Sequence, residues 1–237
     1  MSADIALAVE GLQAWYGESH VLHGVDFHVR RGEVVTLLGR NGAGRTTVLR
    51  AILGLTGQRK GSVRIGGVEA IRRPTYRIAH LGVGYCPEER AIFSSLSAEE
   101  NLLLPPRVSR SDAGMSIEAI YAMFPNLAER RHSPGTRLSG GEQQMLAVAR
   151  ILRTGARLLL LDEISEGLAP IIVQALARMI IALKEQGYTI VMVEQNFRFA
   201  APLADRFYVV EHGRVVTEIG ASELEEKTPM LNELLGV

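Results

Sequence analysis

The stretch GRNGAGRTT, Gly39 to Thr47, constrains the fold of this chain more than any other part of the sequence. The apolar run EVVTLL leads directly into it, and TTVLRAIL follows with helical spacing until Gly54. A strand, a glycine-rich loop and a helix in this order are the context of a phosphate-binding loop, in which backbone N–H groups and the positive end of the helix surround phosphate oxygens. The stretch predicts a nucleotide site in which the Thr46 hydroxyl ligates Mg²⁺, and the alternative is a plain glycine-rich turn.

Arg45 stands where the phosphate-loop pattern calls for lysine. Arginine keeps the positive charge, but its planar fork is bulkier than an ammonium group and prefers bidentate contacts. It can reach the β and γ phosphates, and its fit to the moving charge of a transition state is the weaker point. We therefore keep two hypotheses: a site that hydrolyses its nucleotide at a normal or reduced rate, and a site that only holds it.

Two acids end a continuous apolar run in RLLLLDE, residues 157–163, which predicts a strand buried on both faces. Asp162 would hold Mg²⁺, often through water, and Glu163 would polarise the attacking water. Two acids that cap a strand by chance are the alternative. The phosphate loop earlier in the chain favours the catalytic interpretation.

The stretch LSGGEQQ, residues 138–144, opens a helix that is rich in apolar residues. Ser139, Gly140 and Gly141 offer a hydroxyl and free N–H groups at the N-terminus of this helix, a geometry that binds anions. The alternative is an ordinary capping box between Ser139 and Glu142, and the two interpretations are compatible.

The pattern along the chain predicts an α/β fold. Residues 1–37 contain short β-like pieces and residues 88–153 are mostly helical; strand and helix alternate after Arg157, which favours a mainly parallel sheet with helices on both faces. RFYVVEHGRVVTEIG is expected to form a hairpin that turns at His212-Gly213. SELEEKTPMLNELLGV, near the end of the chain, is expected to form a short surface helix and tail.

Composition disfavours several classes of protein. The 26 basic residues equal the 26 acidic ones, so there is no electrostatic footprint for nucleic acid. The single cysteine, Cys86, rules out an intrachain disulfide and is expected to lie in the core. No apolar run approaches the roughly 18 residues of a membrane span, so another chain would supply any membrane domain. The beginning of the sequence does not have the pattern of a secretory signal.

The phosphate loop, LSGGEQQ and RLLLLDE, in this order, resemble the ATP-binding cassette family, whose signature is LSGGEQQ, and the resemblance covers nearly the whole chain. Tyr16 falls where the family places an aromatic residue that stacks on adenine. SEGLAP, residues 165–170, is similar to the loop that lies at the contact between two cassettes. YCPEERAIFSSLSAEENLL and VEQNFRFAAPLADRFYVVEHGRVV are similar to one of the two ATP-binding subunits of branched-chain amino acid importers.

The resemblance implies a single ABC ATPase domain over residues 1–237. A P-loop NTPase core with a mainly parallel sheet and an N-terminal antiparallel β subdomain would occupy residues 1–87 and 154–237, and an inserted helical subdomain would occupy residues 88–153. Two cassettes would pair head to tail, with each ATP between the phosphate loop of one chain and LSGGEQQ of the other. ATP would close the pair, and hydrolysis would let it open.

The resemblance also implies the partners and the location. The partners would be a second cassette, either a different chain, as in the subfamily, or a copy of this one, together with two transmembrane permease subunits. A substrate-binding protein would act indirectly, and this chain would lie at the cytoplasmic face of the membrane.

The resemblance assigns residues to a site that uses ATP and Mg²⁺ as cofactors. Catalysis would depend on Glu163 and Gln195. The metal would be held by Thr46, Asp162 and Glu88. The ATP-binding residues would be Tyr16, Gly39, Arg40, Asn41, Gly42, Ala43, Gly44, Arg45, Thr46, Thr47, Ser139, Gly140 and Gly141.

The sequence departs from the wider family at three positions besides Arg45. Glu88 stands where the family has a glutamine, and an ionised carboxylate can ligate Mg²⁺ but cannot donate a hydrogen bond. Gln195 stands where the family has a histidine, and its amide can donate a hydrogen bond but carries no charge. Both are typical of the amino-acid-importing subfamily. Ile164 replaces the usual proline after Glu163.

The leading hypothesis is the ATP-hydrolysing subunit of a branched-chain amino acid importer. The alternatives are a cassette that holds ATP while its partner turns over, and the same role in a urea or amide importer. Cassettes that act in DNA repair or on ribosomes usually carry long coiled coils or two cassettes. The single cassette and the absence of net basic charge disfavour that class.

Overall fold

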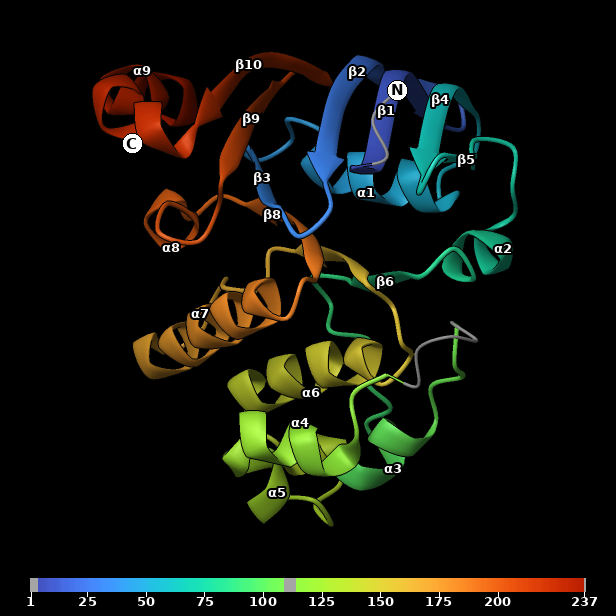
Figure 1. Ribbon diagram of the computed structural model, residues 1–237, viewed down its shortest axis with the longest axis vertical. Coiled ribbons are helices and arrows are strands. Elements are labelled where there is room, and N and C mark those ends of the chain that lie inside the picture. Colours follow the sequence, from blue (N-terminus) through green and yellow to red (C-terminus); the bar gives the residue numbers. More distant parts are fainter. Residues whose placement is uncertain (1–3, 109–113, 237) are drawn as a thin grey trace.

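The computed structural model describes residues 4–108 and 114–236, which form two β-sheets (Figure 1). A four-stranded antiparallel sheet has the order β2-β1-β4-β5, and a six-stranded sheet has the order β10-β9-β3-β8-β7-β6. The strands of the first sheet are β1 (Ile5–Tyr16), β2 (Ser19–Arg30), β4 (Arg59–Ile65) and β5 (Val68–Glu69). Those of the second are β3 (Val34–Leu38), β6 (Val83–Cys86), β7 (Leu158–Asp162), β8 (Thr189–Glu194), β9 (Arg206–Glu211) and β10 (Arg214–Gly220).

Helices cover both faces of the six-stranded sheet, with α1 on one face and α7 on the other (Figure 1). Their bounds are α1 (Arg45–Leu53), α2 (Thr75–Ala79), α3 (Ala98–Leu103), α4 (Ile117–Met123), α5 (Pro125–Glu129), α6 (Gly140–Leu152), α7 (Pro170–Glu185), α8 (Phe197–Ala200) and α9 (Leu224–Leu235). Short 3-10 helices span Gly135–Arg137 and Ala221–Glu223.

The pairing of the strands confirms the predicted α/β class. β3 pairs in parallel with β8 and β9, and β7 pairs in parallel with β6 and β8, while β10 is antiparallel to β9. The predicted hairpin turn is confirmed as well. His212 and Gly213 both have positive φ, 45° and 70°, as a two-residue turn between antiparallel strands requires.

Two hydrophobic clusters form the core, one on each face of the six-stranded sheet. Along β3, Val34 and Leu38 belong to one cluster, while Val35 and Leu37 belong to the other. Alternate side chains of a strand point to opposite faces, so a strand between two helical or sheet layers must be apolar throughout. This explains why β3, β7 and β8 consist wholly of buried residues.

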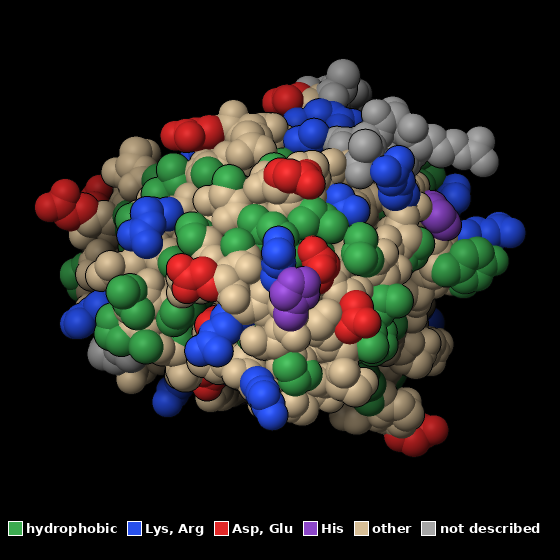
Figure 2. Space-filling view, turned by 90° about the horizontal axis from the view of Figure 1, so that it is seen from below, with side chains coloured by type: hydrophobic (Ala, Val, Ile, Leu, Met, Phe, Trp, Pro, Cys, Tyr) green, Lys and Arg blue, Asp and Glu red, His purple; other side chains and the backbone are tan. Residues whose placement is uncertain are grey.

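The segment between β6 and β7 contains α3 to α6 and projects away from the antiparallel sheet (Figure 1). Ser97 caps α3 in a capping box with Glu100, which fixes where that helix begins. Figure 2 views the molecule from below, so that this end of the molecule faces the reader. On this face basic and acidic side chains are interspersed.

The C-terminal segment forms the predicted surface helix, α9, in which most residues are exposed or half-buried. Two leucines anchor it: Leu231 is fully buried and Leu235 is 6% exposed, and both belong to the cluster that also contains residues of α6 and α7. The two leucines are four residues apart and therefore lie on one face of the helix. Cys86 is buried, as predicted, and burial raises the pKa of its thiol to about 12. Among the described residues, no helix is long and apolar enough to cross a membrane.

Candidate nucleotide-binding site

The predicted phosphate loop joins the end of β3 to the start of α1. Gly42 and Gly44 have φ of 80° and 103°, a left-handed backbone that favours glycine. A Cβ at Gly39 would lie 2.4 Å from the carbonyl oxygen of Val210, so only glycine fits there. No side chain caps α1, and its first turn contains no acid. The N–H groups at its N-terminus therefore face the loop without a competing anion, which fits the phosphate groups of a nucleotide.

Arg45, at the start of α1, is buried and points at the acidic strand end. Its Nη2 donates to Glu163 Oε1 at 2.7 Å and to Asn41 Oδ1 at 3.2 Å. Its Nη1 is buried and has no hydrogen-bond partner among the described residues. A buried unpaired N–H is costly, and a phosphate oxygen would satisfy it. The residue is 4% exposed, so it belongs to the site rather than to the surface.

Thr46 and Asp162 come together, as the sequence predicts. The Thr46 hydroxyl donates to Asp162 Oδ1 at 2.9 Å, and the Tyr85 hydroxyl donates to Asp162 Oδ2, also at 2.9 Å. Asp162 is fully buried, and this burial raises the pKa of its carboxyl, although the two hydrogen bonds oppose the rise. A hydroxyl and a carboxylate at this distance are the oxygen ligands that Mg²⁺ prefers, so the residues fit the ion.

Glu163 directly follows β7 and has a left-handed backbone, with φ of 47°. Its N–H donates to the carbonyl oxygen of Val193 on β8 at 2.9 Å, which holds this conformation. Burial, together with a hydrogen bond to Glu166, raises the pKa of the Glu163 carboxyl to about 7, and Arg45 opposes the rise. A carboxyl that titrates near neutral pH is suited to take a proton from water.

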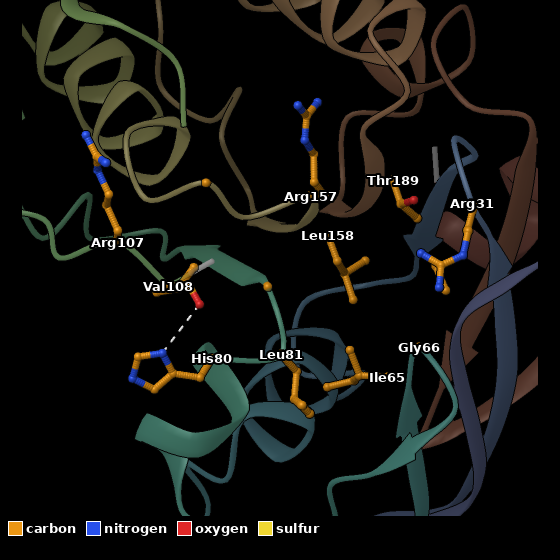
Figure 3. A pocket seen from close by; sticks show the side chains of 13 residues that line it. Arg31, Ile65, Gly66, His80, Leu81, Arg107, Val108, Arg157, Leu158 and Thr189 are labelled. Carbon is orange, nitrogen blue, oxygen red and sulfur yellow. Dashed lines mark hydrogen bonds between the residues drawn. The ribbon is translucent and has the colours of Figure 1, made fainter. Parts of the chain in front are cut away.

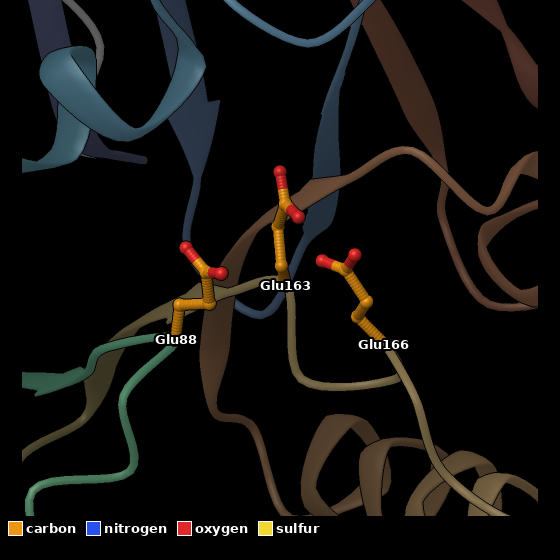
Figure 4. A group of neighbouring side chains, drawn as sticks. All are labelled: Glu88, Glu163 and Glu166. Carbon is orange, nitrogen blue, oxygen red and sulfur yellow. The ribbon is translucent and has the colours of Figure 1, made fainter.

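Glu88, Glu163 and Glu166 form an acidic cluster beside the phosphate loop (Figure 4). One carboxylate oxygen from each lies within 4.8 Å of the others. They come from the segment after β6, the end of β7 and the loop that leads to α7. All three line a cavity of about 410 Å³ together with residues 41–47. The cluster places Glu88 at the same cavity as Thr46 and the phosphate loop.

Gln195, the other predicted catalytic residue, is exposed at the end of β8. It lines a second cavity of about 600 Å³. Glu163 and Glu166 line both cavities, so the two spaces adjoin. Gln195 therefore lines the cavity that adjoins the phosphate-loop cavity and is not part of the lining of the latter.

Six predicted ATP-binding residues do not line the phosphate-loop cavity, and two of them, Gly39 and Arg40, directly precede the residues that do. Tyr16 ends β1 and is 39% exposed. Ser139, Gly140 and Gly141 begin α6, within the helical segment (Figure 1). The capping-box interpretation of this segment is confirmed, because Ser139 Oγ accepts from the Glu142 N–H at 3.3 Å and Glu142 Oε2 accepts from the Ser139 N–H at 2.7 Å.

A larger cavity of about 760 Å³ lies elsewhere, and its lining includes Arg31, His80, Arg107 and Arg157 (Figure 3). It opens where β6, β7 and β8 begin, because Gly82, Leu158 and Thr189 also line it. Ligands of parallel sheets bind at the carboxyl ends of the strands. The phosphate loop lies at that other end, so size alone would have selected the wrong cavity for the nucleotide.

The sequence profile of the family described as ABC transporter matches residues 22–166, from β2 through the phosphate loop to the acidic cluster. This chain belongs to the ABC transporter family. Proteins of this family are ATP-binding cassettes that hydrolyse ATP. This chain has the fold of such a cassette.

Two relatives and one solved structure are similar to this chain over most of its length. The high-affinity branched-chain amino acid transport ATP-binding protein BraG of Pseudomonas aeruginosa is 41% identical over 211 residues, which are 89% of this chain and 91% of BraG. The lipopolysaccharide export system ATP-binding protein LptB of Haemophilus influenzae is 33% identical over 218 residues, 89% of this chain and 88% of LptB.

The solved structure is that of another protein, the ATP-binding cassette MJ0796, in a dimeric post-hydrolysis state bound to ADP and Pi. It shares the ABC fold with a TM-score of 0.78 at 22% identity, covering 91% of this chain and 98% of that one.

Sequence reasoning missed three residues that lie at or beside this ABC site. Tyr85 lies in β6 and bonds Asp162, and Glu166 joins the acidic cluster. Glu194 ends β8 and is buried against Ser165. The sequence pattern could have identified Glu194, because it is an acid at the end of an apolar strand, the same pattern that predicted Asp162 as a site residue. Tyr85 gives no such signal, since an aromatic residue in a buried strand is ordinary.

Proposed function

We propose that this chain is the ATP-hydrolysing subunit of an importer for branched-chain amino acids. The observation that carries the proposal is the pairing of Thr46 with Asp162 at 2.9 Å beside Glu163, whose pKa lies near 7. The higher identity to BraG, 41%, than to LptB, 33%, supports import of branched-chain amino acids over lipopolysaccharide export.

The residues present fit the proposed chemistry. Residues 39–47 would surround the phosphates, and the free Nη1 of Arg45 would bond a phosphate oxygen. Thr46, Asp162 and Glu88 would hold Mg²⁺, which neutralises phosphate charge when bound. Glu163 would accept the proton of the attacking water, and the Gln195 amide would hydrogen-bond the γ-phosphate.

Glu163 must be free before it can act as a base, and this gives Arg45 a second role. In the structure Nη2 of the Arg45 guanidinium forms an ion pair with Glu163 Oε1 at 2.7 Å. Phosphate oxygens would compete for the same guanidinium and release the glutamate. Lysine at this position would have a single ammonium group rather than a fork, so arginine is suited to hold both groups in turn.

The second half of the proposed site would come from another cassette. Ser139, Gly140 and Gly141 lie outside the phosphate-loop cavity of their own chain, which supports their use by a neighbouring cassette. The dimeric state of MJ0796 points the same way. The second cassette would be a different chain or a copy. Two permeases would span the membrane, a substrate-binding protein would act indirectly, and this chain would bind at the cytoplasmic face.

The domain division that we propose follows the same logic. Residues 1–87 and 154–237 would form the nucleotide-binding core with its β subdomain, and residues 88–153 the helical subdomain that carries LSGGEQQ. Nucleic acid is not among the proposed partners, since the net charge is zero.

The second candidate function is an ATP-holding cassette whose partner performs the turnover. The observation that favours it is the Arg45–Glu163 ion pair, which occupies the proposed base. A urea or amide importer is a further alternative for the cargo, because the ATPase subunit makes no contact with cargo in this mechanism.

Steady-state ATP hydrolysis with Mg²⁺ tests the proposal, with the chain alone at high concentration and with its partner cassette and permeases. Glu163→Gln should abolish turnover, and Arg45→Lys should retain it. Glu10→Gln, an exposed glutamate on β1, is the matched control and should change nothing. If the native chain alone is inactive while Arg45→Lys alone hydrolyses, and the complex with the partner cassette still turns over, the chain holds ATP for its partner. Uptake of labelled leucine into vesicles, with urea and a short amide as competitors, tests the cargo.

A further inference from the structure

Glu194 is a buried carboxyl to which the proposed mechanism gives no role. It ends β8 and is 1% exposed. Ser165 supplies two hydrogen bonds to it: the hydroxyl donates to Oε2 at 2.8 Å and the backbone N–H donates to Oε1 at 3.3 Å. Ser165 is itself 5% exposed. The two residues therefore form a buried polar contact, which lies at the wall of the second cavity.

This contact joins two segments that matter for the proposed reaction. Glu194 immediately precedes Gln195, which is proposed to bond the γ-phosphate. Ser165 lies two residues after Glu163 and opens residues 165–170, the loop expected at the contact with the second cassette. The carboxyl of Glu194 is thus the link between that loop and the backbone of Gln195.

A purely structural role explains Glu194 poorly. The rest of β8 is Thr189 followed by four apolar residues, and every residue of the strand is buried. A leucine or methionine would fill this position without the cost of desolvating a carboxyl. Burial is the main reason that the pKa of Glu194 is raised to about 8; the nearby Glu163 adds to the rise, and Ser165 and Arg45 oppose it. At neutral pH the group is therefore mostly a neutral acid.

We propose that Glu194 is a positioning residue that couples the cassette-contact loop, residues 165–170, to Gln195 through its two hydrogen bonds with Ser165. When the second cassette contacts the loop, the contact fixes Ser165, and Ser165 fixes Glu194 and the glutamine that follows it. Loss of the contact leaves nucleotide binding intact but lets Gln195 drift from its place. The inference rests on the proposed function, and it adds a route by which the partner cassette controls hydrolysis.

Kinetics of the complete complex with Ser165→Ala and Glu194→Met test the inference. Each variant should lower kcat about tenfold or more, because small displacements of a positioning group cost this much. The dissociation constant of ATP should stay within about twofold. The double variant should be no slower than the slower single one, since both remove the same contact. Glu194→Gln is neutral and keeps an oxygen for the Ser165 hydroxyl, so it should retain kcat within about threefold. Thr189→Val, at the other end of β8, is the control.

A normal kcat in Ser165→Ala, or effects that multiply in the double variant, would overturn the proposal. Amide hydrogen exchange of the full chain gives a reading that does not require hydrolysis. Ser165→Ala should speed exchange at residues 195–197 and leave β3 unchanged; equal rates at 195–197 contradict the coupling. An inactive native complex would refute the proposed function alone, because the exchange experiment would still decide the coupling. It also decides the case in which Glu194→Met fails to fold.

Discussion

Replacing Glu163 with glutamine should tighten the binding of ADP to the isolated chain roughly tenfold at pH 8. The reason is the ion pair between Arg45 Nη2 and Glu163 Oε1, 2.7 Å long, with side chains 4% and 11% exposed. The guanidinium that would bond a phosphate oxygen is held by the glutamate when no nucleotide is bound. Nη1 can still bond a phosphate oxygen, but the pair neutralises the guanidinium charge and holds Nη2, so phosphate gains less from Arg45.

The size of the effect follows from the change in bond type. A hydrogen bond to a charged group contributes about 1.5–3 kcal/mol and a neutral one about 0.5–1.5 kcal/mol. Glutamine leaves a neutral acceptor, so the competition weakens by about 1–1.5 kcal/mol, which is roughly tenfold in dissociation constant. The gain should vanish at pH 6. Glu163 has a pKa of about 7 and is mostly protonated there, so the native chain has already lost the charged pair.

Titration calorimetry with ADP at pH 8 and pH 6 measures the effect, because ADP lacks the γ-phosphate and is not itself the substrate of hydrolysis. Glu166→Gln is the matched control. It removes a negative charge from the same acidic cluster but leaves the Arg45 ion pair in place. Equal tightening in both variants would mean that general charge repulsion is responsible, and the argument from the ion pair would fail. It would also fail if Glu163→Gln bound ADP no more tightly at pH 8.

Three further predictions concern stability and the metal. Glu194 has a pKa of about 8 when folded against 4.5 as its ordinary value, so the folded chain holds a proton that the unfolded chain releases, and stability falls as pH rises from 4.5 to 8. Glu194→Gln should therefore raise the melting temperature at pH 8.5 but not at pH 4.5. The corresponding gain in unfolding free energy at pH 8.5 is at most about 5 kcal/mol, and an equal shift of the melting temperature at both pH values contradicts the argument. Tyr85→Phe removes the hydroxyl that bonds Asp162 and should raise the Mg²⁺ concentration for half-maximal turnover about tenfold; an unchanged Mg²⁺ titration contradicts it. Leu231→Ala should lower the urea-unfolding free energy by about 2–4 kcal/mol, whereas a surface position would change it by under about 0.5 kcal/mol.

Local chemistry made much of this fold predictable. α1 ends at Leu53 with Gly54 in a left-handed cap, and α6 begins after Ser139 in a capping box. Both boundaries are set by residues adjacent in the chain, so the sequence alone identifies them. The pairing of Thr46 with Asp162 was also predictable, because Asp162 ends one strand of the parallel sheet and Thr46 begins the helix after the loop that follows another.

Contacts that depend on distant packing were not predictable. In α9 the spacing of Leu224, Leu231 and Leu235 indicates one apolar face, but not that this face packs against the cluster that contains residues of α6 and α7. Tyr85 reaches Asp162 only because β6 and β7 are neighbours in the sheet. The ion pair of Arg45 with Glu163 joins residues 118 positions apart. Only the folded sheet shows that the arginine, which replaces the usual lysine, faces the proposed catalytic glutamate.

The place of β3 in its sheet has a consequence for how the chain folds during synthesis. β3 emerges from the ribosome early, yet its two neighbours are β8 and β9, which begin at Thr189 and Arg206. β1 and β2 are joined by a two-residue turn and can pair first, and β4 can join them once residues 59–65 have emerged. The strand that carries the phosphate loop must wait, flanked by no partner, until most of the chain has been made. A ribosome stalled before residue 189 should therefore display a nascent chain with a formed β subdomain and no affinity for nucleotide.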